Sequence, residues 1–122
     1  MKRILLAAAI LLAALTSSSA QVRIVGHRGV RHNIDTPDTR NFENTIPALE
    51  YCQGLGIYAA EFDIQLTNDE RIIVFHGPKL PKNSLSVPDG AANDVHEMTY
   101  SQARKVVLPG GHRIPTLKEW LN

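Results

Sequence analysis

Three apolar, strand-like runs in this chain each end in side chains that can move a proton or hold a metal ion. The first run leads into His27 and Arg28, the second into Glu61 and Asp63, and the third into His76. In a parallel α/β sheet the carboxyl ends of successive strands meet at one edge, which is where α/β barrels keep their catalytic residues. The pattern therefore predicts an α/β fold in which these five side chains converge on one site.

The expected elements follow from periodicity and helix-capping signals. Strands are expected at 22–25, 57–66 and 71–76, and helices at 46–55, at 99–108 and from 116 onward. Asn44 or Thr45 is a suitable N-cap for the first helix, with Pro47 in its first turn. Thr99 and Thr116 each open a capping-box pattern for a later helix.

Alternation within the second strand assigns its side chains to two faces. Glu61 and Asp63 share one face, whereas Phe62, Ile64 and Leu66 share the other, which is expected to pack under helices. The stretch 77–94 is rich in Pro, Gly, Asn and Ser and is expected to be a long loop next to the site.

Residues 1–20 have the pattern of a secretory signal peptide. Lys2 and Arg3 precede an uncharged apolar stretch over 4–15, and small residues follow up to Ala20. The apolar stretch is shorter than the roughly 20 residues that a membrane-spanning helix needs. We therefore expect cleavage before Gln21, export to a periplasm or out of the cell, and no stable membrane span afterwards.

The length of the remaining domain, 21–122, limits what it can form. A complete eight-stranded α/β barrel needs about 250 residues. We therefore expect an incomplete domain that holds roughly the first three strands of a barrel, with uncovered apolar surface and little or no turnover on its own.

Charge and cysteine content exclude several classes of protein. The 13 Lys and Arg residues, two of which lie in the leader, are balanced by 12 Asp and Glu residues, and no basic run remains. Nucleic acid and anionic membrane surfaces are therefore poor candidates for partners. Cys52 is the only cysteine, so no intrachain disulfide supports the fold.

The acidic pair and the two histidines suggest complementary chemistry. Glu61 and Asp63 on one strand face repel each other unless a cation lies between them, and carboxylate oxygens suit hard cations better than zinc. Taken alone, a solvent-facing edge strand is the simpler interpretation of this pair. His27 and His76 can divide general acid and base work, and the planar fork of Arg28 suits a phosphate.

In chain order, the motifs resemble those of the glycerophosphodiester phosphodiesterase family. The resemblance rests on Gly26-His27-Arg28-Gly29, on Phe42-Glu43-Asn44-Thr45 where the family usually has Pro-Glu-Asn-Thr, on Glu61-x-Asp63, on Val74-Phe75-His76 and on Ile114-Pro115-Thr116-Leu117. It implies the N-terminal portion of a phospholipase-C-like TIM barrel. It also implies the hydrolysis of small glycerophosphodiesters to glycerol 3-phosphate and an alcohol.

The resemblance also implies roles for particular residues. It implies that His27 and His76 are the general acid/base pair. It implies that Arg28 and Glu43 bind the substrate, and that Glu61 and Asp63 are ligands of a divalent cation, Ca²⁺ or Mg²⁺. The family often has His-Asp where this chain has His76-Gly77, so a local orienting carboxylate is missing. A further acidic metal ligand of the family is expected on a later strand, beyond Asn122.

Two alternatives stay open at this point. One is an exported, non-catalytic or truncated relative that binds a divalent cation without turnover. The other is a related sphingomyelinase or phosphoinositide phospholipase, because those barrels also place two histidines and carboxylates around a cation. The preferred alcohol group, the identity of the ion and the oligomeric state are not specified by the sequence.

Overall fold

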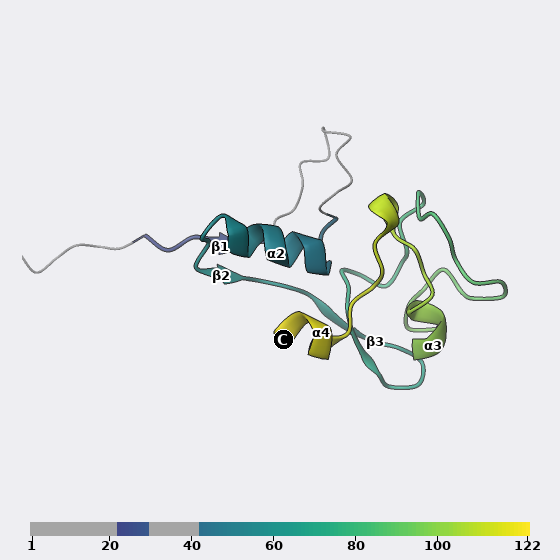
Figure 1. Cartoon of the computed structure of the whole chain (residues 1–122). Coiled ribbons are helices and arrows are strands. Elements are labelled where there is room, and N and C mark those ends of the chain that lie inside the picture. The colour runs from purple at the N-terminus through teal and green to yellow at the C-terminus, as the bar shows by residue number, and fades with distance from the viewer. Residues whose placement is uncertain (1–21, 30–41) are drawn as a thin grey trace, which may run out of the picture.

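The computed structural model describes residues 22–29 and 42–122 (Figure 1). The predicted signal peptide over 1–20 lies outside the described residues, so export stays a prediction. Within the described part of the chain, no helix is long and apolar enough to cross a membrane.

The elements follow one another along the chain in a mixed α/β order. They are β1 (Val25–Gly26), α2 (Ile46–Gly54), β2 (Ala59–Ala60), β3 (Ile64–Leu66), β4 (Ile72–Val74), α3 (Tyr100–Ala103), the 3-10 turn η2 (Pro109–Gly111) and α4 (Leu117–Leu121). The described residues form two two-stranded sheets and not a closed barrel, so the eight-stranded barrel stays a prediction.

The first sheet is the parallel unit that the sequence predicts. β1 pairs with β2 in parallel, with Val25 opposite Ala59 and Gly26 opposite Ala60, and α2 forms the crossover between them (Figure 1). A β-carbon on Gly26 would lie 2.7 Å from the Cys52 Sγ and 2.2 Å from the Gly29 carbonyl oxygen. Glycine is therefore required where this strand end passes under the helix.

The α2 helix begins as expected. Thr45 is its N-cap, and its hydroxyl accepts a hydrogen bond from the backbone N–H of Ala48. Pro47 lies in the first turn, where its missing N–H costs nothing. Beyond the C-cap, Gly56 adopts the left-handed φ of 68°, which stops the helix at the predicted glycines.

The prediction of one parallel strand over 57–66 followed by a parallel third strand is wrong. The chain leaves β2 after Ala60 and re-enters a strand only at Ile64. β3 then pairs with β4 in antiparallel fashion, with Ile64 opposite Val74 and Leu66 opposite Ile72. The reason is the short connection, because a parallel crossover needs a dozen or more residues and only 67–71 separate these strands.

The prediction that the apolar face of this segment packs under helices is also partly wrong. Phe62 packs against the buried ring of Trp120, with 5.2 Å between the ring centroids and the two planes tilted by 41°. Ile64 and Leu66, however, are each 52% exposed. The outer face of the hairpin therefore remains uncovered in the described part of the chain.

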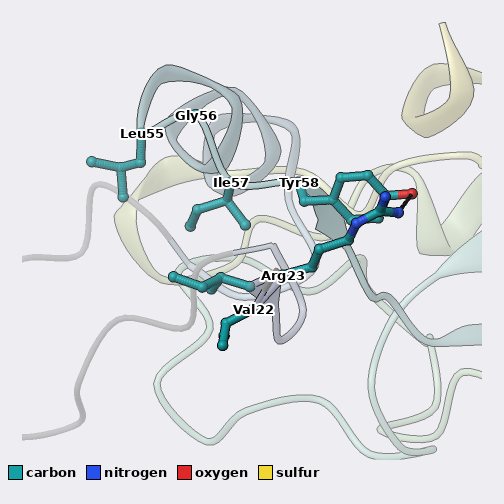
Figure 2. Close-up of a pocket in the computed structure, with 7 residues that line it drawn as sticks. Val22, Arg23, Leu55, Gly56, Ile57 and Tyr58 are labelled. Atoms are coloured by element: carbon teal, nitrogen blue, oxygen red, sulfur yellow. Dashed lines mark hydrogen bonds between the residues drawn. The ribbon is translucent and has the colours of Figure 1, made fainter. Parts of the chain in front are cut away.

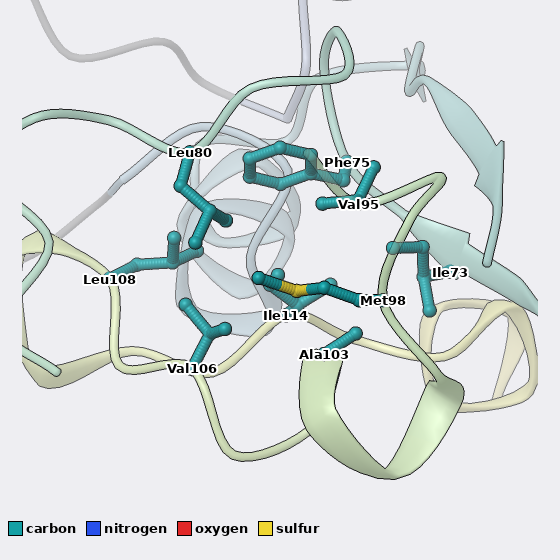
Figure 3. Close-up of a cluster of buried hydrophobic side chains, with 9 residues drawn as sticks. All are labelled: Ile73, Phe75, Leu80, Val95, Met98, Ala103, Val106, Leu108 and Ile114. Carbon is teal, nitrogen blue, oxygen red and sulfur yellow. The ribbon is translucent and has the colours of Figure 1, made fainter. Parts of the chain in front are cut away.

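The main core lies between β4 and the C-terminal third of the chain (Figure 3). Its members are buried apolar side chains, most of them on segments without regular secondary structure: Ile73, Phe75, Leu80, Val95, Met98, Ala103, Val106, Leu108 and Ile114. The backbone N–H of Val74 donates to the Pro115 carbonyl at 2.8 Å, which ties β4 to the segment before α4.

The two predicted capping boxes are present, but the first helix is shorter than predicted. Thr99 and Gln102 cap α3, which ends at Ala103 and not near Leu108. The following chain is extended because Val107 pairs with Ser86 and with Arg113. Val106 and Leu108 on either side of it are buried in the core.

Candidate active site

The loop after β1 carries His27 and Arg28 and is held against the segment after β2. The Arg28 backbone N–H donates to Glu61 Oε2 at 3.0 Å, and the Gly29 N–H donates to the Glu61 carbonyl at 3.1 Å. Arg28 itself adopts a left-handed φ of 57°. The Glu61 carboxylate therefore lies beside His27, whose Nε2 is 3.9 Å from Glu61 Oε2.

The Arg28 guanidinium lies between two of the predicted acidic residues. Its Nη1 donates to both Glu43 oxygens, at 3.1 and 3.0 Å. Its Nε lies 3.2 Å from Asp63 Oδ2, although the N–H is not aligned for a hydrogen bond. The Arg28 side chain is only 13% exposed, so this cation compensates both carboxylates in a largely desolvated position.

The antiparallel hairpin brings His76 to the same place. Because β4 runs back along β3, its end lies beside Asp63, and the Phe75 N–H donates to the Asp63 carbonyl at 3.0 Å. The next residue, His76, then has its Nδ1 3.8 Å from Glu43 Oε1. The predicted residues meet as expected, but His76 arrives by reversal of the chain and not at the end of a third parallel strand.

A chain of contacts thus connects all six predicted site residues. On one side the His27 imidazole lies near the Glu61 carboxylate, which accepts the Arg28 backbone N–H. On the other side the Arg28 guanidinium donates to Glu43, whose carboxylate lies near the His76 imidazole, and Asp63 lies beside the same guanidinium. The two imidazoles are roughly half exposed, so both can reach a ligand from solvent. Their individual roles stay predictions.

Asn44 lies in the site, although the sequence predicted for it only a possible helix cap and a place in the Phe42-Glu43-Asn44-Thr45 motif. Its Nδ2 donates to Asp63 Oδ2 at 2.9 Å, and its Oδ1 accepts the Asp63 backbone N–H at 3.1 Å. Two features of the sequence could have identified it. Asn44 is next to Glu43, and Thr45 alone can cap the helix, which leaves the Asn44 side chain available for another role.

The oxygen atoms of Glu61 and Asp63 are the candidate donors for a divalent cation. In the described ranges, no group of three or more His, Cys, Asp and Glu side chains is arranged to hold a metal ion. Glu61 and Asp63 nevertheless offer only oxygen donors, the type that Ca²⁺ and Mg²⁺ prefer. The Glu61 side chain is 46% exposed and is the more open of the two. The chemistry of these residues therefore fits a hard cation.

A small cavity of about 160 Å³ adjoins His76. It is lined by residues from the segment before α2, the end of β4 and the loop that follows: Phe42, Glu43, Phe75, His76, Lys79 and Pro81. The cavity thus combines two aromatic rings with charged groups of both signs. A larger hollow of about 410 Å³ lies among residues that precede β1 and β2, where Arg23 donates to the Tyr58 hydroxyl at 2.7 Å (Figure 2). It is at the opposite end of these strands from His27.

Two carboxyl groups outside the site have altered pKa values. Hydrogen bonds from the Thr67 hydroxyl and the Tyr100 backbone N–H lower the pKa of Asp69 below its ordinary value of 3.8. Burial acts to raise the pKa of Glu119, but hydrogen bonds from Thr116 and the positive charge of Arg104 outweigh it and lower this pKa below 4.5. Both carboxylates hold helix starts and do not take part in the site.

Comparison with known proteins shows which family the chain resembles. The glycerophosphocholine phosphodiesterase GDE1 of Eremothecium gossypii is 31% identical over 86 residues, which cover 70% of this chain and 6% of that protein. A crystal structure from Silicibacter pomeroyi, provisionally described as a glycerophosphoryl diester phosphodiesterase, has a TM-score of 0.64 at 27% identity and covers 85% of this chain and 40% of its own.

A third comparison concerns the fold alone. A phosphodiesterase of Oleispira antarctica, solved in complex with the product sn-glycerol-3-phosphate, has a TM-score of 0.62 at 22% identity and covers 81% of this chain and 38% of its own. The chain therefore spans well under half the length of each of these relatives. The sequence model of the glycerophosphoryl diester phosphodiesterase family matches residues 27–122, and the chain belongs to this family.

Proposed function

We propose that the domain represented by this chain hydrolyses glycerophosphodiesters to glycerol 3-phosphate and an alcohol. Membership of the family supports the reaction class. The observation that carries the proposal is the position of Arg28 between two imidazole-bearing ends of one contact chain. That arrangement offers a cation for a phosphate and two groups that can exchange protons on either side of it.

The protein's own residues divide the work as follows. Arg28 binds the phosphate of the substrate, and Glu43 contributes to substrate binding in the cavity beside His76. One imidazole, that of His27 or His76, accepts the proton of the attacking water or glycerol hydroxyl as the attacking oxygen bonds to phosphorus. Attack by the glycerol hydroxyl gives a cyclic phosphate, which water then opens to glycerol 3-phosphate. The other imidazole donates a proton to the alcohol oxygen as its bond to phosphorus breaks.

Glu61 and Asp63 would hold a divalent cation, Ca²⁺ or Mg²⁺, which when bound supplies positive charge to the phosphoryl oxygens. Arg28 already balances part of the negative charge of this cluster. The cation would therefore add positive charge to an acidic cluster whose negative charge Arg28 already balances in part.

The test combines turnover with product binding. The purified 21–122 segment is incubated with glycerophosphocholine, with and without EDTA, and the release of glycerol 3-phosphate is measured. Binding of glycerol 3-phosphate is measured in parallel by calorimetric titration. Replacing either His27 or His76 by Ala should lower any turnover by roughly 10²–10⁴-fold while leaving product binding largely intact. A segment that shows no turnover and also does not bind the product would contradict the proposal. Turnover of sphingomyelin in preference to glycerophosphocholine would point to the related phospholipases instead.

A second candidate is a domain that binds a cation without turnover. It is favoured by Gly77, which follows His76 where the family often has an aspartate, so that the adjacent residue supplies no carboxylate to orient this imidazole for catalysis. Calorimetric binding of Ca²⁺ or Mg²⁺ without product release would support this candidate.

A further inference from the structure

Asn44 lies where three segments of the site meet. It follows Glu43 and precedes the N-cap of α2, and it is only 1% exposed. Its backbone N–H donates to the Arg28 carbonyl at 3.0 Å, while its side chain reaches Asp63. A single buried residue therefore connects the loop after β1, the start of α2 and the segment between β2 and β3.

The contact with Asp63 is made at two points. The amide oxygen of Asn44 accepts the Asp63 backbone N–H at 3.1 Å, and the amide nitrogen donates to the carboxylate oxygen Oδ2 at 2.9 Å. The first bond fixes where the residue lies, and the second fixes the orientation of its carboxylate. This restraint matters because residues 61–63 lie between β2 and β3 and belong to no strand, so the regular hydrogen bonds of a sheet do not hold them in place.

The side chain of Asn44 is not needed to cap α2. The hydroxyl of Thr45 already accepts the Ala48 N–H, and it also donates to the Phe42 carbonyl. In addition, Asn44 holds a left-handed φ of 56°, a conformation that costs other non-glycine residues about 1–2 kcal/mol but that asparagine tolerates better. The position thus combines an unusual backbone conformation with an amide whose nitrogen and oxygen both bond to Asp63.

We infer that Asn44 is a positioning residue that orients the Asp63 carboxylate toward a cation at the site. Within the described residues, the contacts of this carboxylate with Asn44 and Arg28 both go to Oδ2, so Oδ1 is the oxygen presented to a ligand. Partners that orient a metal-binding carboxylate in this way commonly contribute 10–100-fold to metal affinity. The inference rests on the proposed function for the presence of the cation.

The test replaces Asn44 by glycine. Glycine adopts the φ of 56° without strain, so Asn44→Gly deletes the amide and keeps the backbone path. The matched control is Thr67→Val, because Thr67 is also buried and its hydroxyl makes several hydrogen bonds, but in the hairpin turn away from the site. Affinity for Ca²⁺ and for Mg²⁺ is measured by calorimetry, and stability by thermal unfolding.

Asn44→Gly should bind the cation about 10–100-fold more weakly, whereas Thr67→Val should lose stability and keep the wild-type affinity. Equal affinity in Asn44→Gly and the wild type, or an equal loss of affinity in the control, would overturn the inference. So would a wild-type protein that binds neither cation.

A second measurement does not depend on the variant folding. In the wild-type protein, the Asp63 amide should exchange its proton slowly with solvent, because the buried Asn44 oxygen accepts it; rapid exchange would overturn the inference. Release of glycerol 3-phosphate from glycerophosphocholine is assayed separately. Absence of both this release and glycerol 3-phosphate binding would refute the proposed activity, while a difference in cation affinity between wild type and Asn44→Gly would still support the role of Asn44.

Discussion

Replacing Arg28 should show how strongly the acidic cluster depends on its internal cation. The guanidinium is 13% exposed and faces the carboxylates of Glu43 and Asp63, which are 19% and 29% exposed. Arg28→Ala would leave both negative charges in a partly desolvated position. Removing one partner of a buried ion pair costs 3–5 kcal/mol, and this cluster is partly open to solvent, so we expect a loss of about 3 kcal/mol.

Two further variants separate charge from packing. In Arg28→Lys a single ammonium can approach only one carboxylate well, and the expected loss is about 1–2 kcal/mol. In the double variant Arg28→Ala/Glu43→Gln, one of the two carboxylate charges that faced Arg28 is also removed, so this protein should be more stable than Arg28→Ala alone. Free energies of unfolding are measured by urea denaturation at pH 7, followed by circular dichroism.

The reasoning would be refuted by a loss of less than about 1 kcal/mol in Arg28→Ala, which would place the pair among ordinary surface ion pairs. A double variant no more stable than Arg28→Ala would also refute it, because the cost would then come from lost packing and not from uncompensated charge.

Three other predictions concern the scaffold. Ile114→Ala should lower the free energy of unfolding by about 2–5 kcal/mol because Ile114 is fully buried in the main core, whereas Ile64→Ala on the exposed hairpin face should cost much less; equal losses in chemical denaturation would contradict the assignment of the core. Thr116→Ala should cost about 1 kcal/mol by removing the capping box of α4, and an unchanged melting temperature would argue against that cap. Hydrogen bonds lower the pKa of Asp69 in the folded protein, so the stability contributed by this carboxylate is present above its ordinary pKa of 3.8 and is lost as the pH falls through the lowered folded pKa. Asp69→Asn should therefore make the free energy of unfolding less dependent on pH below about 4, as measured by thermal unfolding at acidic pH. An unchanged pH profile would contradict the role of this carboxylate.

Local signals in the sequence were sufficient to place several elements of the fold. The cap at Thr45 and the glycines after α2 set the limits of that helix, and the boxes at Thr99 and Thr116 begin α3 and α4 where predicted. These signals work because capping and turn formation depend on residues within about four positions of one another. The motifs also contained the six site residues in chain order.

The connection after Leu66 shows a signal that was present but was not used. Its five residues, 67–71, are too few for a parallel crossover and favour a hairpin, so the reversal of β4 could have been predicted. The early end of α3 could not, because it depends on the pairing of Val107 with Ser86, which is distant in sequence.

The sequence by itself determined which chemical groups are available and where the helices begin. Only the tertiary structure decided how those groups are paired: Arg28 compensates Glu43 and Asp63, and Asn44 orients Asp63 instead of capping a helix. The physical reason is range. A helix cap is satisfied by its nearest neighbours, whereas the partner of a buried charge or amide is whichever polar group the folded chain brings within about 3 Å, and that depends on segments that approach one another only after folding.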